Sequence, residues 1–184
     1  MQRQDPAILI IVLAAAVLVV AAIFASGCTA PVEPAPSAST GEAWRTIHFK
    51  DVRTGETLTI DGFSGRPVIL YAFTVSCPIC TRQQKEITAL KSALGDQVEV
   101  IGLDIDPGED SETLKAHIAQ NEFKGYYSLS PIEMTQSLLD EFGPVVITPA
   151  SAPVIAICPD GTARILDTGI KPLDTLRAAV TSEC

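Results

Sequence analysis

The chain has 184 residues, a formal net charge of −9 and 47% hydrophobic residues. This length holds about one domain of ordinary size plus additional segments. An acidic chain is a poor match for a groove that follows nucleic-acid phosphates, so nucleic acid is not an expected partner. His48 and His117 stand far apart and lack a neighbouring acidic cluster. Both are expected to be exposed or at a hairpin edge, no metal or cofactor is predicted, and the chemistry is expected to come from cysteine.

The N-terminal segment predicts attachment to a membrane. Residues 7–25 carry no charge, and their number is close to the roughly 20 apolar residues that a helix needs to cross a bilayer. Residues 25–28 read Ala-Ser-Gly-Cys and resemble the lipobox of prokaryotic lipoproteins, which would make Cys28 a possible lipidation site. Residues 1–28 are therefore predicted to be a signal anchor or a lipoprotein signal. Both alternatives place the remaining chain on the extracytoplasmic face of the cell membrane.

Residues 29–43 are rich in Pro, Ala and Ser and predict a linker, and residues 44–184 predict the folded domain. The expected elements, in chain order, are a hairpin formed by 44–50 and 56–60, a buried strand over 67–74, a helix over 78–94, a strand over 98–105, helices over 111–121 and 131–142, a second hairpin formed by 153–158 and 163–166, and a closing helix over 172–181. A strand, a helix and a strand in succession indicate a βαβ unit, and the whole pattern indicates an α/β domain.

The motif Cys77-Pro78-Ile79-Cys80 lies where the first buried strand ends and the next helix begins. Unpaired N–H groups and the helix dipole at a helix N-terminus favour a thiolate, so Cys77 is the expected attacking sulfur. Pro78 fits the first turn, where its missing N–H costs nothing. Cys80 returns one turn later on the same face and can form a redox-active disulfide with Cys77.

Two other interpretations of the cysteine pair are weaker. A zinc site would need a second pair of ligands, and Cys158 and Cys184 stand singly. A purely structural disulfide across three residues would close too small a loop to stabilise the fold much. Thiol–disulfide exchange is therefore the favoured chemistry.

On these motifs the sequence resembles the thioredoxin superfamily, in particular the membrane-tethered, TlpA-like thiol–disulfide oxidoreductases of prokaryotes. The resemblance implies a thioredoxin-like α/β fold, with a central mixed β-sheet flanked by helices and an N-terminal β-hairpin. It further implies that Pro153, rather than Pro149, is a cis-proline packed beside Cys77, and that Ala152 offers its backbone to a partner strand. Further candidate substrate contacts, on the loop before the first cysteine, are Thr74 and Ser76.

Three departures from the family pattern concern the surroundings of the cysteines. Ser76 replaces a tryptophan, Tyr71 replaces a buried aspartate, and Gln83 replaces a glutamate that many TlpA-like sequences carry. The loss of both acids leaves open how Cys80 is deprotonated. The sequence therefore leaves both redox directions open, reduction and oxidation of partner proteins.

The predicted function is exchange of disulfides with partner proteins and with an unidentified redox partner. The main alternative is a peroxiredoxin-like thiol peroxidase, because Thr74 stands three positions before Cys77 and could hydrogen-bond a peroxide. A Sco-like copper carrier would need a histidine after His117, and the sequence has none. A non-catalytic binding domain on the same fold is a further alternative.

Two more features are open to interpretation. In the implied fold Cys158 and Cys184 both reach the end of the domain opposite the active site, where they either form a structural disulfide or remain a buried strand thiol and a terminal thiol. The acidic segment 104–110 lacks the spacing of a calcium-binding loop, so it predicts a strand end followed by charges at a helix N-terminus.

Overall fold

A computed structural model describes residues 42–184. The expectations for the signal segment 1–28, for Cys28 and for linker residues 29–41 lie outside these residues. Within 42–184, no helix combines the length and the apolar character needed to cross a bilayer.

A five-stranded mixed sheet forms the centre of the domain, with strand order β5-β4-β3-β6-β7. Strands β3, β4 and β5 are parallel, whereas β6 and β7 are antiparallel to their neighbours. This is a thioredoxin-like α/β arrangement and contains the expected βαβ unit. The strands are β3 (Val68–Phe73), β4 (Glu99–Asp104), β5 (Tyr126–Leu129), β6 (Val154–Ile157) and β7 (Ala163–Ile165).

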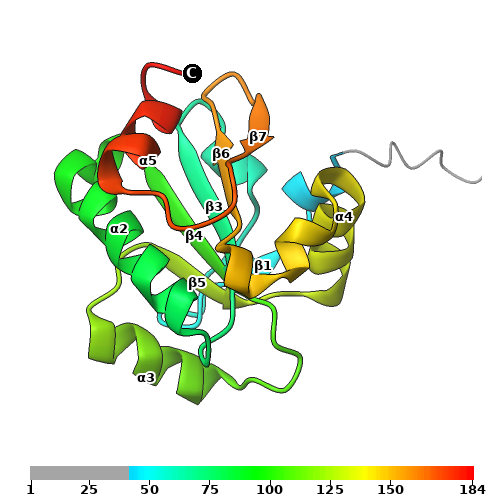
Figure 1. Ribbon diagram of the computed structural model, residues 1–184. Coiled ribbons are helices and arrows are strands. Elements are labelled where there is room, and N and C mark those ends of the chain that lie inside the picture. The colour runs from blue at the N-terminus through cyan, green and yellow to red at the C-terminus, as the bar shows by residue number, and fades with distance from the viewer. Residues whose placement is uncertain (1–41) are drawn as a thin grey trace, which may run out of the picture. The chain divides into compact units, whose positions relative to one another are not determined.

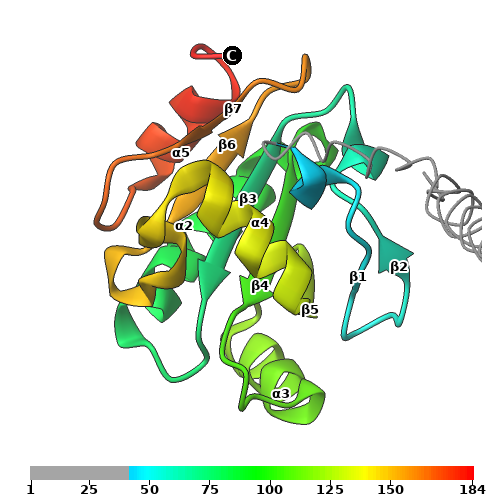
Figure 2. The same cartoon turned by 90° about the vertical axis from the view of Figure 1, so that its right-hand side faces the viewer.

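Helices cover both faces of this sheet (Figures 1 and 2). On one face lie α2 (Pro78–Leu94) and α5 (Leu173–Val180), which pack together with the inner side of α3 (Ser111–Asn121). Helix α4 (Ile132–Phe142) covers the other face, where it crosses in front of the sheet in Figure 2. The domain therefore has three layers with the sheet in the middle.

Strand β3 is the centre of the core because all six of its residues are buried. Alternate side chains enter opposite layers: Ile69 and Phe73 pack on the side of α2 and α5, and Leu70 packs on the side of α4. Burial on both faces matches its nearly continuous apolar sequence. Each large side chain removed from water in this way contributes on the order of 2 kcal/mol.

The helices expected over 78–94 and 111–121 have those same bounds in the structure, and the other expected helices and strands are present with ends shifted by one or two residues. The first hairpin is shorter than predicted: only β1 (Phe49–Lys50) and β2 (Thr57–Leu58) pair. Strand β5, only four residues long, was not predicted, and neither were the short 3₁₀ helices that connect α4 to β6.

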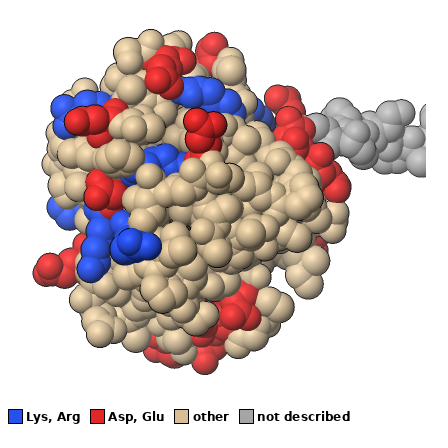
Figure 3. Space-filling model, viewed as in Figure 1, with Lys and Arg blue, Asp and Glu red and all other residues tan. Residues whose placement is uncertain are grey.

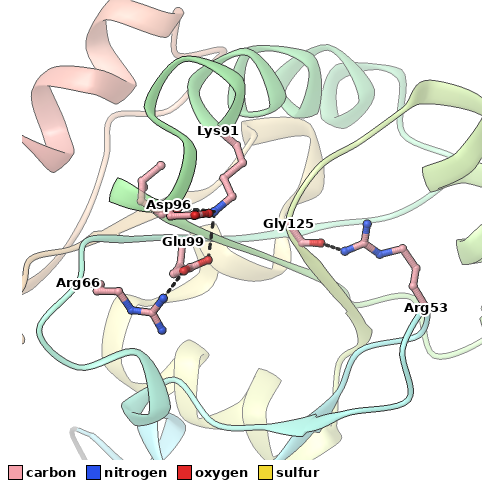
Figure 4. A network of polar contacts seen from close by, with 7 residues as sticks. Arg53, Arg66, Lys91, Asp96, Glu99 and Gly125 are labelled. Carbon is pink, nitrogen blue, oxygen red and sulfur yellow. Dashed lines mark hydrogen bonds and ion pairs between the residues drawn. The ribbon is translucent and has the colours of Figure 1, made fainter.

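Hydrogen bonds from the turn of the first hairpin attach it to the edge of β5. Asp51 is completely buried, and its carboxylate accepts hydrogen bonds from the Tyr127 amide at 2.9 Å and from the Thr54 amide at 3.0 Å. Arg53 donates to the carbonyl of Gly125 (Figure 4). The hairpin thus covers an edge that would otherwise expose unpaired backbone groups.

A second polar network holds the amino-terminal ends of β3 and β4 together (Figure 4). The buried carboxylate of Glu99 pairs with Arg66 and accepts a hydrogen bond from Lys91 at 3.3 Å. Lys91 also donates to the carbonyl of Val98 at 2.8 Å. Because both carboxylate oxygens have cationic donors, the buried charge is compensated.

At the same end of the sheet, Cys158 and Cys184 are joined by a disulfide with a Cα–Cα distance of 5.3 Å. Cys158 follows β6, whose last residue Ile157 pairs with Val68 at the start of β3. The bridge therefore lies about 20 Å from the other end of β3, given roughly 3.3 Å per strand residue.

We predict that Cys184→Ser lowers the free energy of unfolding by about 3 kcal/mol, because the bridge closes a 26-residue separation in the unfolded chain. Urea denaturation of protein from an oxidising compartment measures this change. Cys158→Ser should give the same loss, and the double variant no more than either single one. Free thiols at both positions in non-reducing peptide mapping of the Cys77→Ser, Cys80→Ser variant would contradict the bridge.

Candidate active site

The cysteine motif occupies the turn between β3 and α2. The Cys77 amide donates to the carbonyl of Thr74 at 3.1 Å, which closes a tight turn directly after the strand. Cys77 then caps α2, and Pro78 takes the first helical position. The sequence folds this way because Pro78 cannot continue the strand's hydrogen bonds but fits a first helical turn.

The two sulfurs have different surroundings. Cys77 is half-buried, and its Sγ accepts a hydrogen bond from the Cys80 amide at 3.2 Å. Cys80 is only 2% exposed, and its Sγ lies 3.3 Å from the carbonyl oxygen of Pro149. The pair forms a disulfide with a Cα–Cα distance of 5.2 Å, within the usual range. An accessible sulfur capped by a helix amide is suited to attack, and a buried partner one turn later is suited to resolve.

The segment before β6 differs from the expectation for Ala152 and Pro153. Within 42–184 there is no cis peptide bond, so the predicted cis-proline at Pro153 is wrong. The chain instead turns through a 3₁₀ helix ending at Ser151 and a left-handed Ala152, with φ 50° and ψ 58°. Pro149, which the sequence analysis ranked below Pro153, supplies the carbonyl next to Cys80.

Backbone groups of Ala152 already have partners. Its amide donates to Pro149 at 2.8 Å, and its carbonyl accepts from the ammonium group of Lys171. Ala152 is also only 3% exposed. Pairing of a partner strand with Ala152 therefore remains a prediction that would require these bonds to rearrange.

Lys171 is a buried residue of the site that the sequence analysis missed. Its Nζ also donates to the carbonyl of Gly169 at 2.8 Å. Its backbone amide and carbonyl both bond the side-chain amide of Gln83, at 2.6 and 3.2 Å. Burial lowers the pKa of Lys171 to about 8, while Asp167 opposes that shift. Gln83 therefore links α2, the helix that contains Cys80, to the loop before α5. It does so with an uncharged side chain, where the glutamate expected from the resemblance would be charged.

The remaining sequence candidates surround the cysteine turn. Thr74 is half-buried and Ser76 is exposed, so both side chains lie where a partner could meet them. Tyr71 is buried, and burial raises its pKa well above the ordinary value, so the phenol stays neutral. The position of its ring requires a glycine at Gly102 of β4, because a Cβ there would lie 2.7 Å from Tyr71 Oη.

The two histidines differ in burial. His48 is exposed, as predicted. The expectation for His117 is wrong: it is buried, its ring lies against Phe73 and Phe123, and its Nε2 is 2.9 Å from the side-chain oxygen of Gln84. Burial lowers the pKa of His117, so the ring is a neutral part of the core.

A buried acid stands on the neighbouring strand. Asp104 ends β4 beside Phe73 and is 1% exposed. One carboxylate oxygen accepts from the Asp106 amide at 3.1 Å, whereas the other has no partner within 42–184. Burial raises the pKa of Asp104 to about 7, with the nearby charge of Glu109 adding to the shift. Asp110 caps α3 by accepting from the Glu112 and Thr113 amides, so segment 104–110 is the expected strand end and helix start.

Comparisons with known proteins agree with this architecture. The family model of the AhpC/TSA family matches residues 40–141. No curated protein sequence matches the chain. Similar solved structures include a secreted Mycobacterium tuberculosis disulfide oxidoreductase homologous to E. coli DsbE, with 15% identity, coverage of 76% of this chain and 97% of that one, and a TM-score of 0.58.

Two further structures have the same fold. A thiol:disulfide interchange protein of the thioredoxin family from Chlorobium tepidum has 12% identity, coverage of 74% and 91%, and a TM-score of 0.61. A DsbF homologue from Corynebacterium diphtheriae has 14% identity, coverage of 74% and 83%, and a TM-score of 0.61.

We predict that Asp104→Asn makes the domain more stable than the wild type at pH 8 by at least ~1 kcal/mol. The folded-state pKa, about 7, lies above the ordinary 3.8, so the folded state holds the extra proton between these values and wild-type stability falls as pH rises through them. Urea denaturation at pH 5 and pH 8 measures the difference. Equal pH dependence in both proteins would contradict the assignment.

We predict that Lys171→Met speeds amide hydrogen exchange at Ala152 at least about tenfold, because the buried carbonyl of Ala152 and the carbonyl of Gly169 lose their donor and the turn before β6 loosens. Exchange is followed by NMR at neutral pH. Lys85→Met, on the exposed side of α2, is the matched control and should leave this amide unchanged. Similar rates in wild type and Lys171→Met would show that the ammonium group does not hold the turn.

Proposed function

The chain belongs to the AhpC/TSA family, and on that premise we propose that it is a thiol–disulfide oxidoreductase that exchanges disulfides with partner proteins through Cys77 and Cys80. The observation that carries the proposal is the difference between the two sulfurs. Cys77 is accessible and capped by a helix amide, whereas Cys80 is buried one turn behind it. This geometry separates an attacking from a resolving sulfur.

In the reducing direction, the Cys77 thiolate attacks one sulfur of a partner disulfide. A bond forms between these two sulfurs, the partner's S–S bond breaks, and its second sulfur leaves as a thiolate that takes up a proton. Cys80, deprotonated, then attacks Cys77 Sγ and releases the first partner sulfur. The products are the Cys77–Cys80 disulfide and a partner dithiol, with two electrons passed to the partner. The reverse sequence oxidises a partner dithiol.

We further propose that the domain works on the extracytoplasmic face of the membrane. Residues 1–28 would supply the anchor, either as an uncleaved helix or through lipidated Cys28, and residues 29–43 would supply the linker to domain 44–184. A disulfide between Cys158 and Cys184, remote from the active site, fits an oxidising compartment. The Mycobacterium tuberculosis protein of the same fold is described as secreted.

The test uses single cysteine variants and insulin as the disulfide substrate. Cys77→Ser should abolish insulin reduction, at least about a thousandfold, because no attacking sulfur remains. Cys80→Ser should accumulate mixed disulfides through Cys77, because nothing resolves them. Cys184→Ser is the control and should keep the activity, since its sulfur lies at the far end of the domain.

Three outcomes would contradict the proposal. Consumption of hydrogen peroxide faster than insulin disulfides by orders of magnitude would identify a thiol peroxidase that uses Cys77, with Thr74 beside it. Trapping of partners through Cys80 instead of Cys77 would reverse the assigned roles. Insulin reduction no faster than the uncatalysed background in the wild type and in both active-site variants would indicate a non-catalytic domain.

A further inference from the structure

The resolving sulfur lies against a backbone carbonyl. Cys80 is 2% exposed, and its Sγ is 3.3 Å from the carbonyl oxygen of Pro149. The sulfur of a disulfide has no proton to donate, whereas the Cys80 thiol of the reduced protein has one. The same oxygen accepts the Ala152 amide at 2.8 Å, and a carbonyl can accept two hydrogen bonds. The reduced protein can therefore form an S–H···O bond that the oxidised protein lacks.

This carbonyl belongs to a turn in an unfavourable conformation. Residues Pro149–Ser151 form a 3₁₀ helix, and Ala152 follows with φ 50° and ψ 58°. Within residues 42–184, Ala152 and Glu122 are the only residues other than glycine with a positive φ. A residue with a Cβ adopts this left-handed conformation only where its surroundings stabilise it. The position of the Pro149 carbonyl therefore depends on contacts that hold the turn.

Lys171 supplies such contacts. It is 3% exposed, and its ammonium group donates to the carbonyl of Ala152 and, at 2.8 Å, to the carbonyl of Gly169. Burial lowers the pKa of Lys171 to about 8, with Asp167 opposing the shift, so the group is mainly protonated at pH 7. A buried cation is unfavourable unless it is hydrogen-bonded, so the ammonium group and the Ala152 carbonyl keep each other in place.

The backbone of Lys171 is attached to the helix of Cys80. The Lys171 amide donates to the side-chain oxygen of Gln83 at 2.6 Å, and the Gln83 side-chain nitrogen donates to the Lys171 carbonyl at 3.2 Å. Gln83 is buried and follows Cys80 by three residues, which places both on one side of α2. Lys171 thus connects α2 with the turn 149–152, and the spacing of these two segments sets the contact between the sulfur and the carbonyl.

We propose that Lys171 is a positioning residue that keeps the Pro149 carbonyl against Cys80, where the carbonyl accepts a hydrogen bond from the thiol of the reduced protein. This bond stabilises the dithiol and has no counterpart in the disulfide, so it shifts the redox equilibrium toward the reduced form. The proposal rests on the proposed function and deepens it, because a residue outside the cysteine motif takes part in setting the redox equilibrium of that site.

Equilibrium with glutathione tests this role. Two glutathione thiols reduce the Cys77–Cys80 disulfide to a dithiol and become one glutathione disulfide, so two electrons and two protons pass to the protein. The full-length protein is equilibrated at pH 7 and quenched with acid, its thiols are alkylated, and the peptide with both cysteines is quantified by mass spectrometry. Lys171→Met should lower the equilibrium constant for reduction at least about threefold, which corresponds to a reduction potential lower by about 14 mV, because the dithiol loses its hydrogen bond.

Other cations lie on the same side of the molecule, so the test needs a charge control. Figure 3 shows Lys and Arg side chains at the surface over the region where Figure 1 places α2 and α5. Lys85→Met makes the same charge change on the exposed side of α2 and should leave the equilibrium constant unchanged. Gln83→Leu keeps the ammonium group but cuts its backbone from α2, so it should lower the constant as Lys171→Met does. Gln83→Leu also decides the outcome if Lys171→Met does not fold.

Alkylation of Cys80 separates position from charge. In the Cys77→Ser protein with Cys80 reduced, the reaction of Cys80 with iodoacetamide is followed at pH 7 by mass spectrometry of its peptide. Adding Lys171→Met should raise the rate at least about threefold, because a thiol without its acceptor ionises more readily. Loss of positive charge alone would lower the rate, because a nearby cation favours the thiolate. A lower rate overturns the positioning role, and so does an equilibrium constant that Lys171→Met leaves unchanged.

These measurements use no protein substrate, so they separate the role of Lys171 from the proposed function. Both shifts in a protein that does not reduce insulin would preserve the role of Lys171 at the cysteine pair and refute the proposed function. Reduction of insulin by a protein in which Lys171→Met shifts neither quantity would preserve the oxidoreductase and refute the positioning role.

Discussion

The first turn of α2 must find acceptors for its free amides, and in this domain one acceptor is a sulfur atom. Burial of β3 on both faces fixes where the strand ends, and Pro78 fixes where the helix begins. Cys77 lies between these two constraints. Its position at the helix N-terminus, its partial exposure and the burial of Cys80 one turn later all follow from that junction. The chemistry of the site is therefore a consequence of how a strand is joined to a helix.

Polar groups behind the cysteines are distributed in a distinctive way. Tyr71 and Gln83 are neutral, and the cation near Gln83 is Lys171, whose backbone bonds Gln83 while its ammonium group bonds the carbonyls of Ala152 and Gly169. The buried acid instead ends the neighbouring strand as Asp104. The buried acid of this part of the domain thus lies at the end of β4, beside the last residue of β3, and not beside Gln83.

Much of the fold could be predicted because its elements have strong local signals. Helix α2 has Pro78 at its start, and β3 is an unbroken apolar run. Strand β5 was missed because four residues are too few to show a period, and its pairing with β4 depends on distant residues. His117 was misplaced although its spacing from Leu114 and Ile118 puts it on the buried face of α3, because a polar residue type was weighed above that spacing.

For the site, the reactive pair could be predicted, but the surroundings could not. Helix position and cysteine spacing are local properties of the sequence. The contacts of Lys171 with Ala152 and Gln83 join residues separated by 19 and 88 positions, so they become visible only when the chain is folded. The contact between Cys80 and the carbonyl of Pro149 could not be predicted either, because packing against α2 sets the turn before β6.

The bridge between Cys158 and Cys184 also bears on the fate of the newly made protein. The bridge ties the segment after α5 to the end of β6, and it can form only where thiols are oxidised. Among reducing thiols the segment after α5 is held by noncovalent contacts alone, so it opens more easily to proteases. The oxidation state of this one bond therefore sets the protease resistance of the domain without involving the active site.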